Sequence, residues 1–340
     1  MGKNMNILVI GGAGYIGSHT TVELLEAGFA PIVLDDFSGS ERKALACIKD
    51  VTGKDIELVE GDFADTQLVE TTLKKYKIAG VIHFAAFKAV GESVEQPLKY
   101  YRNNVVGFIS LVELLSKHDI PLVFSSSAAV YGEPPVESVD EETICVPVSP
   151  YGSSKLMDEI ILRDVCKSKA PMRGIALRYF NVVGAHHSGS FGEMPKLPPQ
   201  NLLPIIVQAV AGLRPPLPVY GTDYDTPDGT CQRDYIHVVD LAKAHIAALN
   251  HLLKQSKGYY DVFNVGTGVP TSVLGMINAF EKINKEKVPH KLVGRRPGDP
   301  RAAYANATKI QRALGWKSEK SVEDAVGDAW RWQLRLGGKE

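Results

Sequence analysis

The sequence predicts an α/β fold built on a doubly wound parallel sheet, with a smaller lobe in the C-terminal half. Three observations lead to this prediction. Short, nearly continuous apolar runs alternate with helical patterns over the first half of the chain, which is typical of parallel strands buried on both faces. A glycine-rich turn joins the first of these runs to the first helical pattern. After Asn181 the chain becomes rich in Gly, Pro and Asn and loses its periodicity.

The expected strands of the sheet follow one another along the first half of the chain. They cover residues 6–10, 31–34, 56–59, 80–84, 122–124 and 174–177. A helix is expected over 17–27, where Gly28 ends it. Right-handed crossovers between parallel strands then place helices on both faces of the sheet.

The domain organisation follows from the change in composition. We expect a dinucleotide-binding unit over 1–181 and a substrate-binding lobe over 182–340, with a return to the first unit near 234–254. Segment 182–232 is proline-rich and has little periodicity. Long segments of this kind in compact enzymes are usually functional.

Composition and charge exclude several classes of protein. The 340 residues carry a formal net charge of −1, so no basic excess is present to hold a nucleic acid or an anionic membrane. No apolar run approaches the roughly 20 residues that a membrane span needs. The four cysteines lack metal-like spacing, and the pair His186-His187 lacks a third ligand. We therefore expect a cytoplasmic protein with reduced thiols and no metal.

The sharpest local motif is G-x-x-G-x-x-G, formed by Gly11, Gly14 and Gly17 between the first strand and the first helix. In such a motif the first glycine allows a tight turn and the second allows the backbone to approach a pyrophosphate. The third lets the helix pack close to the sheet. The helix N-terminus then offers N–H groups to the phosphates. The motif predicts a dinucleotide site.

An acidic pair at the end of the second strand indicates which dinucleotide is bound. Asp35 stands 18 residues after Gly17 and is followed by Asp36. An acid at this distance accepts hydrogen bonds from the ribose hydroxyls. Because a carboxylate there repels a 2′-phosphate, the sequence predicts NAD rather than NADP.

The glycine spacing and the segments after the later strands resemble the extended short-chain dehydrogenase/reductase family. The resemblance implies an NAD site that uses residues from several strand ends. These residues are Gly11, Gly14, Tyr15, Ile16, Gly17, Asp35, Asp36, Asp62, Phe63, Phe84, Ala85, Ala86, Lys88, Asn103, Ser125, Tyr151, Lys155 and Tyr179.

Ser127, Tyr151 and Lys155 are the candidate catalytic residues. Tyr151 and Lys155 are four residues apart on an expected helix, so they share one face. An unperturbed tyrosine has a pKa of about 10, and a nearby ammonium and a nicotinamide cation both lower it. Tyr151 can then act as a general base toward a sugar hydroxyl, and Ser127 would share the hydrogen bond to that hydroxyl.

The residues after Ser127 exclude one reaction of this superfamily. In the nucleotide-sugar dehydratases, an Asp-Glu pair follows the catalytic Ser or Thr and eliminates water. Here those places hold Ala128 and Ala129. The sequence therefore favours simple redox chemistry at one carbon over elimination.

Within the superfamily, the chain resembles the UDP-galactose 4-epimerase family from about residue 5 to about residue 333. The matching segments are 83–94, 149–155, 178–181, 201–204, 232–237 and 295–299. The family's substrate residues fall on Lys88, Ser127, Tyr151, Phe180, Asn181, Asn201, Leu202, Tyr220, Arg233, Arg296, Asp299 and Ala303. By this resemblance Arg233 and Arg296 clamp a diphosphate, which suits the planar guanidinium group.

The resemblance implies reversible epimerisation at C4 of UDP-galactose and UDP-glucose, through a transient 4-keto sugar and enzyme-bound NADH. Ala303 occupies the family's gate beside the C2 substituent, where a tyrosine excludes N-acetylhexosamines and a cysteine admits them. Since alanine is smaller still, we expect UDP-GalNAc and UDP-GlcNAc to be substrates as well. By analogy with relatives, we also expect a homodimer.

Several alternatives remain open from the sequence. The substrate could be UDP-xylose/UDP-arabinose or UDP-glucuronate, with the same catalytic residues. A decarboxylase would need a group that recognises a sugar carboxylate, and none is identifiable. A catalytically inactive NAD-binding sensor is expected to lack the Tyr151 and Lys155 pair, so the presence of this pair argues against it.

Overall fold

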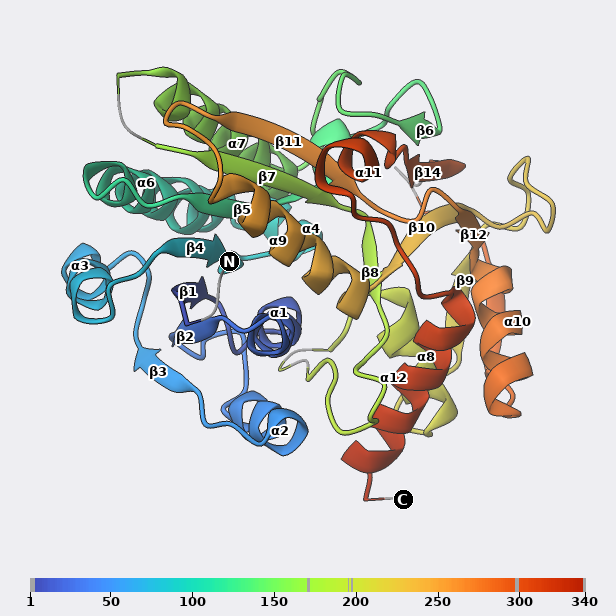
Figure 1. Cartoon of the computed structure of the whole chain (residues 1–340). Coiled ribbons are helices and arrows are strands. Elements are labelled where there is room, and N and C mark those ends of the chain that lie inside the picture. Colours follow the sequence, from blue (N-terminus) through green and yellow to red (C-terminus); the bar gives the residue numbers. More distant parts are fainter. Residues whose placement is uncertain (1–3, 170–171, 195, 197, 297–299, 339–340) are drawn as a thin grey trace.

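The central layer of the computed structural model is a seven-stranded parallel sheet (Figure 1). The structure describes residues 4–169, 172–194, 196, 198–296 and 300–338. In spatial order the strands are β11 (Tyr260–Val265), β7 (Gly174–Tyr179), β5 (Leu122–Ser127), β4 (Gly80–His83), β1 (Asn6–Ile10), β2 (Ala30–Asp35) and β3 (Glu57–Glu60). The chain passes from one side of β1 to the other between β3 and β4, which confirms the predicted doubly wound sheet.

Helices cover both faces of this sheet. One face carries α1 (Tyr15–Glu26), α2 (Lys43–Thr52), α9 (Val238–Leu252) and α11 (Thr308–Leu314), and the other carries α3 (Thr66–Lys75), α6 (Gly107–Lys117) and α7 (Pro150–Lys167). The segment before α6 is made of α4 (Val90–Glu95), α5 (Pro97–Tyr100) and the π-helical η1 (Tyr101–Val106). Every residue of β4 and β7 is buried, which explains why these strands show no polar alternation.

A second lobe lies beyond the carboxyl ends of the strands (Figure 1). Its five-stranded sheet contains β12 (Pro270–Ser272), β10 (Gln232–His237), β14 (Ala302–Ala305) and β6 (Ser138–Val139) in that order, and β8 (Asn181–Val183) pairs with β10. A two-stranded sheet joins β9 (Leu217–Tyr220) to β13 (His290–Val293). The helices of this lobe are α8 (Leu202–Val210), α10 (Val273–Asn284) and α12 (Val322–Leu336), which enclose a separate hydrophobic core.

The return of the chain to the first lobe differs from the expectation in two ways. β10 lies in the second sheet, so the expected return near 234–254 begins only with α9. After α9 the chain adds β11 to the large sheet, a strand that the sequence did not predict. The segment contains Asp261 and Asn264 and is only partly buried in its first half, so it lacks the continuous apolar run of the central strands.

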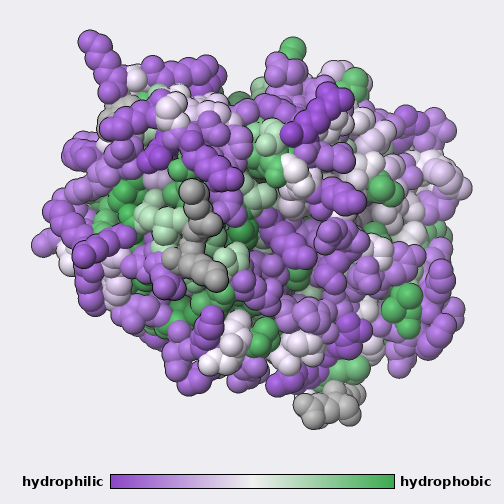
Figure 2. Space-filling view, in the orientation of Figure 1, coloured by the Kyte–Doolittle hydropathy of each residue, from purple (hydrophilic) through white to green (hydrophobic). Residues whose placement is uncertain are grey.

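The surface is mainly hydrophilic on the face shown in Figure 2, with hydrophobic side chains exposed in smaller areas. Within the described part of the chain, none of the helices combines the length and the apolar composition that crossing a membrane requires.

Candidate active site

The glycine loop before α1 is shaped by close contacts that only glycine permits. Gly11 has a φ of +76°, and a Cβ atom there would lie 2.7 Å from the backbone nitrogen of Ala85. A Cβ atom on Gly17 would lie 2.2 Å from the carbonyl oxygen of Gly11. By contrast, a Cβ atom on Gly14 would meet only that same oxygen, at 3.2 Å. The loop is therefore closed on its inner side and open at Gly14.

The open side of the loop has the properties of an anion site. Gly14 is the N-cap of α1 and has no side chain to bond the first N–H groups of the helix. Tyr15 and Ile16 begin the helix, so their backbone N–H groups belong to this uncapped end. The residues present thus fit the pyrophosphate of a dinucleotide.

Asp35 links the glycine loop to the end of β2. Its buried carboxylate accepts hydrogen bonds from the backbone N–H of Ala13 (2.9 Å) and Phe37 (2.9 Å) and from the Ser40 hydroxyl (2.7 Å). Asp36 is exposed and accepts from Ser38. The Asp35 charge is therefore fixed beside the loop. Its predicted contact with the cofactor ribose stays a prediction.

Ser127 and Tyr151 meet at the carboxyl edge of the sheet. Ser127 ends β5, and the short helix η2 (Ala128–Tyr131) follows it. Tyr151 lies in the first turn of α7, where the Ser149 hydroxyl accepts from the Gly152 N–H (3.1 Å) and caps the helix. Burial raises the pKa of the Tyr151 phenol, whereas a hydrogen bond from Ser127 lowers it.

Lys155 lies one turn further along α7 and is buried. Its Nζ atom donates to the Ser125 carbonyl oxygen (2.8 Å) and lies 4.7 Å from the centre of the Phe124 ring. Burial lowers the pKa of Lys155, while Asp158 and Glu159 raise it. Since burial raises the pKa of Tyr151, formation of the phenolate depends on positive charge close to the phenol.

A buried ion pair holds α7 against the sheet. Arg178 of β7 donates to both carboxylate oxygens of Glu159, over 2.7–3.2 Å. Glu159 also accepts from the Ser126 hydroxyl, and Arg178 donates to the Tyr131 hydroxyl (2.9 Å). This network connects α7, β5, β7 and η2, and so it fixes the elements that carry Ser127, Tyr151 and Lys155.

The remaining residues predicted to bind the cofactor are spread along the same edge of the sheet. Tyr179 bonds His245 (2.9 Å), and Phe84 packs on His245 with 4.7 Å between ring centres. Phe63 is buried against His83, while Asp62 and Lys88 are exposed. Asn103 donates to the neighbouring Asn104, and Ala85 and Ala86 are half-buried beside the glycine loop. Their contacts with NAD remain predictions.

The second lobe brings several predicted substrate residues onto two neighbouring strands. Arg233 of β10 pairs in register with Ala303 of β14, and its Nη1 atom donates to the Pro300 carbonyl oxygen (2.9 Å). Asn181 begins β8, which pairs with the other end of β10. Arg233, Asn181 and Ala303 therefore share one sheet.

Other predicted substrate residues lie on the adjoining elements. The Arg296 guanidinium lies 5.5 Å from the centre of the Tyr220 ring. Asn201 is the exposed N-cap of α8 and Leu202 is its first residue, while Phe180 is buried. Asp299 lies outside the described residues. Its predicted role is not addressed by the structure.

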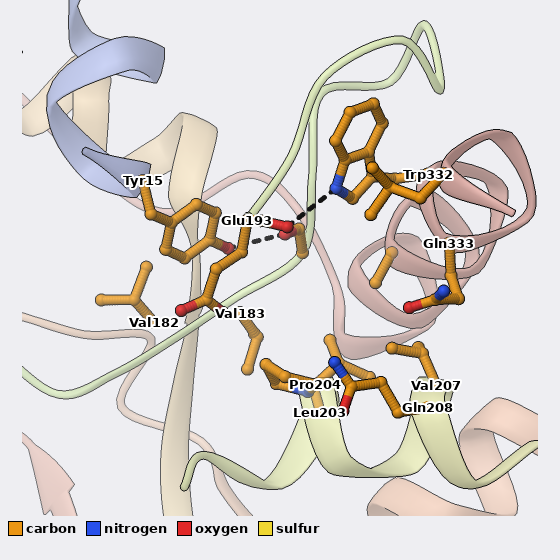
Figure 3. A pocket seen from close by; sticks show the side chains of 13 residues that line it. Tyr15, Val182, Val183, Glu193, Leu203, Pro204, Val207, Gln208, Trp332 and Gln333 are labelled. Atoms are coloured by element: carbon orange, nitrogen blue, oxygen red, sulfur yellow. Dashed lines mark hydrogen bonds between the residues drawn. The ribbon is translucent and has the colours of Figure 1, made fainter. Parts of the chain in front are cut away.

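A small cavity lies where α1, α8 and α12 meet (Figure 3). Trp332 of α12 donates from its indole nitrogen to the Glu193 carbonyl oxygen (2.9 Å), and Tyr15 of α1 bonds Gly184. Its volume of about 50 Å³ is far below the roughly 300–1,000 Å³ of ligand pockets. The cavity is therefore a packing space between the lobes.

No group of three or more His, Cys, Asp and Glu side chains within the described ranges is arranged to hold a metal ion. The rings of His186 and His187 lie 4.2 Å apart, and His186 instead bonds Ser188 (2.9 Å).

Comparison with known proteins places this site in a family. A family model described as GDP-mannose 4,6 dehydratase matches residues 8–329. The chain is 47% identical to the UDP-glucose 4-epimerase of Bacillus subtilis (strain 168), over 97% of both chains. It is also 47% identical to the UDP-glucose 4-epimerase of Homo sapiens, over 96% of both. The chain belongs to the UDP-glucose 4-epimerase family.

Solved structures of the UDP-glucose 4-epimerase family share the fold over nearly the whole chain. The enzyme from Stenotrophomonas maltophila, with bound NAD and formylated UDP-arabinopyranose, matches with a TM-score of 0.95 and 41% identity, covering 98% of this chain and 99% of that one. The enzyme from Bifidobacterium longum, in complex with NAD+ and UDP, matches with a TM-score of 0.92 and 44% identity, covering 99% of this chain and all of that one. These matches confirm the predicted family.

Sequence reasoning missed several residues that support the epimerase site. Glu159 and Arg178 form the buried pair described above. Asp234 is fully buried and accepts from the backbone N–H of Thr267 (2.8 Å), Gly268 (2.9 Å) and Ala305 (3.1 Å). It holds β10, and hence Arg233, against β14. These partners are distant in sequence, so only the fold shows the role of Asp234.

Proposed function

We propose that Tyr151, Ser127 and Lys155 carry out the reaction of the UDP-glucose 4-epimerase family in this chain. The reaction is the reversible, NAD-dependent epimerisation of UDP-galactose and UDP-glucose at C4. The observation that carries the proposal is that Ser127 at the end of β5, Tyr151 and Lys155 on α7, and the glycine loop lie at one carboxyl edge of the sheet, where Ser127 lowers the pKa of the Tyr151 phenol.

The chain's own residues have distinct tasks. NAD, held at the glycine loop, would supply the hydride acceptor and donor for C4. Tyr151 takes the proton of the C4 hydroxyl as a general base and later returns it. Ser127 holds that hydroxyl, and the Lys155 ammonium favours the phenolate. Arg233 and Arg296 hold the diphosphate while the sugar turns about its link to it.

Product analysis tests this function. The purified protein is incubated with UDP-galactose without added NAD, and the nucleotide sugars are separated. Conversion to UDP-glucose is the expected result, because the proposed cycle regenerates NAD. If conversion fails even with NAD added, the proposal is wrong, and UDP-pentoses and UDP-glucuronate are the next substrates to assay.

We further propose that N-acetylhexosamine substrates are accepted. Ala303 is half-buried on β14, beside Arg233, and its methyl side chain leaves room for a substituent on C2 of the sugar. Incubation with UDP-N-acetylgalactosamine is expected to give UDP-N-acetylglucosamine. Inactivity with this substrate, in a preparation that converts UDP-galactose, would contradict the prediction from Ala303.

A homodimer is also proposed, through the outer surface of α4, α5, η1, α6 and α7. These elements pack together, and they expose the apolar side chains of Val90, Val94, Leu98, Val106, Ile109, Met157 and Ile160, which are 40–74% exposed. A second copy of the same surface would bury these side chains symmetrically. Contiguous exposed apolar side chains of this kind mark interaction sites.

Sedimentation velocity tests the dimer. Leu98 is 74% exposed, and Leu98→Glu is expected to give a monomer because it buries charge in the interface. Leu213→Glu is the matched control, since Leu213 is 65% exposed in the other lobe. A monomeric parent, or a Leu98→Glu variant that remains dimeric, contradicts this interface.

We propose a cytoplasmic location, which the free thiols of Cys47, Cys145 and Cys166 support, because oxidising compartments favour disulfides. Fractionation of cells that express the tagged protein tests this, and recovery in an exported fraction would overturn it.

A further inference from the structure

Asp158 is a buried carboxyl group that the catalytic scheme above leaves unused. It lies on α7, three residues after Lys155, and only 1% of its surface is exposed. Its Oδ1 atom is buried and has no hydrogen-bond partner among the described residues. A buried acid with an unpartnered oxygen destabilises a fold unless a charge or a function compensates for it.

The neighbouring acid, Glu159, is compensated by its own cation. Arg178 donates to both of its carboxylate oxygens, and the side chains of both residues are almost fully buried. The charges of this pair cancel locally. Asp158 is therefore an additional acid in the same interior, outside the pair.

Lys155 is the cation next to Asp158. Residues three apart on a helix are neighbours, with about 5–6 Å between their Cβ atoms. Lys155 is 3% exposed, and its only described neutral partners are the Ser125 carbonyl oxygen and the Phe124 ring. A carbonyl oxygen and a ring face offer partial charges only. The full negative charges that act on the ammonium are those of Asp158 and Glu159, and Arg178 already binds Glu159.

The electrostatics of the two groups are reciprocal. Burial raises the pKa of Asp158 well above its ordinary value, Lys155 lowers it, and Glu159 raises it. Burial lowers the pKa of Lys155, and Asp158 is the largest influence in the opposite direction, followed by Glu159. Each group therefore favours the charged form of the other.

The other titratable groups around this part of α7 are occupied or neutral. Burial lowers the pKa of His83 on β4 to about 3, so its imidazole is neutral at the working pH. On the elements packed against α7, the buried or half-buried titratable groups are Arg178 and Tyr179 on β7, Tyr131 on η2, Tyr260 and Asp261 on β11, Tyr100 on α5, Tyr101 on η1 and Glu92 on α4. The exposed ones are Glu95 on α4, Lys99 on α5, Arg102 on η1, and Glu113 and Lys117 on α6. Arg178 is bound to Glu159 and Tyr131, and Glu92 is bound to Tyr100 and Lys99.

We propose that Asp158 is the buried counter-charge that keeps Lys155 in its ammonium form, and that it acts on Tyr151 only through Lys155. Asp158 is in this sense a positioning residue. The inference rests on the roles proposed above for Tyr151 and Lys155. Without the carboxylate, Lys155 loses its proton at a lower pH, and a neutral amine no longer favours the Tyr151 phenolate. The kcat of the variant is then expected to begin to fall at a lower alkaline pH than the kcat of the parent.

The test is the pH profile of kcat for UDP-galactose in the NAD-loaded enzyme. Asp158→Asn is expected to move the alkaline limb to lower pH by about 1 unit or more, the size of shift that one nearby charge produces. The KM for UDP-galactose is expected to stay unchanged, because Asp158 is buried in the protein interior. Asp158→Leu should give the same shift and a lower melting temperature than the parent, since it leaves the buried Lys155 ammonium without its counter-charge.

Asp164→Asn is the matched control, because Asp164 lies on the same helix with its side chain 61% exposed. Its profile is expected to overlay that of the parent. Profiles of Asp158→Asn and Asp158→Leu that overlay the parent would overturn the inference, and so would an equal shift in Asp164→Asn. If the parent does not convert UDP-galactose, or if Tyr151→Phe is fully active, the proposed function fails first and the inference falls with it.

Discussion

The Tyr15 hydroxyl donates a hydrogen bond of 2.6 Å to the carbonyl oxygen of Gly184, a residue 169 positions further along the chain. Tyr15 begins the helix that follows the glycine loop, and Gly184 directly follows β8, a strand of the second lobe. The bond joins the cofactor-binding end of one lobe to the entry into the other. Both groups lie at the cavity between the lobes (Figure 3).

Tyr15→Phe is expected to destabilise the protein by about 1–3 kcal/mol, because the buried Gly184 carbonyl loses its partner while the ring remains. Denaturant unfolding of the NAD-loaded protein measures this. Tyr76→Phe serves as the control, since the Tyr76 hydroxyl bonds the exposed Glu57, and little change is expected there. Equal stability of the parent and Tyr15→Phe would show that the contact between the lobes does not depend on this bond.

Gly17→Ala and Gly14→Ala are expected to have different effects, with a loss of stability in the first and a loss of NAD in the second. At Gly17 the added methyl group would lie 2.2 Å from the Gly11 oxygen, so the loop itself must move and the protein loses stability. At Gly14 the methyl group would meet one protein atom, the Gly11 oxygen at 3.2 Å, which requires only a small shift. It projects toward the expected pyrophosphate, so we expect the fold to be retained and NAD to be lost. Thermal melts and the absorbance of retained NAD separate the two effects. Gly39→Ala is the control, because a Cβ atom on Gly39 would have no neighbour within 4 Å. It is expected to change neither stability nor NAD content.

Tyr151→Phe is expected to lower kcat by about 10²–10⁴-fold, the usual contribution of a general base. NAD content should match that of the parent, because the ring and the fold are unchanged. Initial rates with UDP-galactose and the absorbance of bound cofactor after gel filtration are the two measurements. A variant that retains near-parent rates would assign the base to another residue.

His83 makes the protein sensitive to acid. Its ring is buried against Phe63, Phe108 and Phe124, and its Nδ1 atom has no partner among the described residues. Burial lowers its pKa from 6.5 to about 3. The stability linked to the neutral ring is fully present above pH 6.5, and it is lost as the pH falls from 6.5 toward 3, because only the unfolded chain binds the proton.

Because of His83, the free energy of unfolding is expected to fall by about 1.4 kcal/mol for each pH unit below 6.5. Urea unfolding of the parent and of His83→Phe between pH 7.5 and 4.5 measures it, and the stability difference should change in favour of the variant below pH 6.5. His187→Asn, at an exposed position, should follow the parent. Parallel curves for the parent and His83→Phe would rule out His83 as a source of acid sensitivity.

Ala303→Tyr is expected to abolish conversion of UDP-N-acetylgalactosamine and to preserve that of UDP-galactose, because the phenol ring fills the space beside C2. The ratio of kcat/KM for the two substrates is the measurement. Ala303→Cys, a smaller change, is expected to keep both activities. If Ala303→Tyr converts both substrates as the parent does, C2 of the sugar does not face this position.

The sequence predicted the site best where the chemistry is local. Gly11, Gly14 and Gly17 lie in one turn, and Tyr151 and Lys155 lie on one helix face, so their spacing alone indicates their relationship. Asp158 and Glu159 follow on the same helix, where an acidic pair normally indicates a solvent-exposed face. Their burial depends on Arg178 and on β5 and β7, which are distant in sequence. Likewise, β11 is recognised as a strand only through its pairing with β7.

The position of β11 also affects how the protein is made. The chain leaves the large sheet at Tyr179 and rejoins it at Tyr260, so a ribosome must synthesise the intervening segment before the sheet is complete. At about 5–20 residues per second this takes several seconds. During that time β7 is an unpaired edge made mainly of apolar residues, which is a template for aggregation. We therefore expect the nascent chain to need protection by a chaperone until residue 265 has emerged.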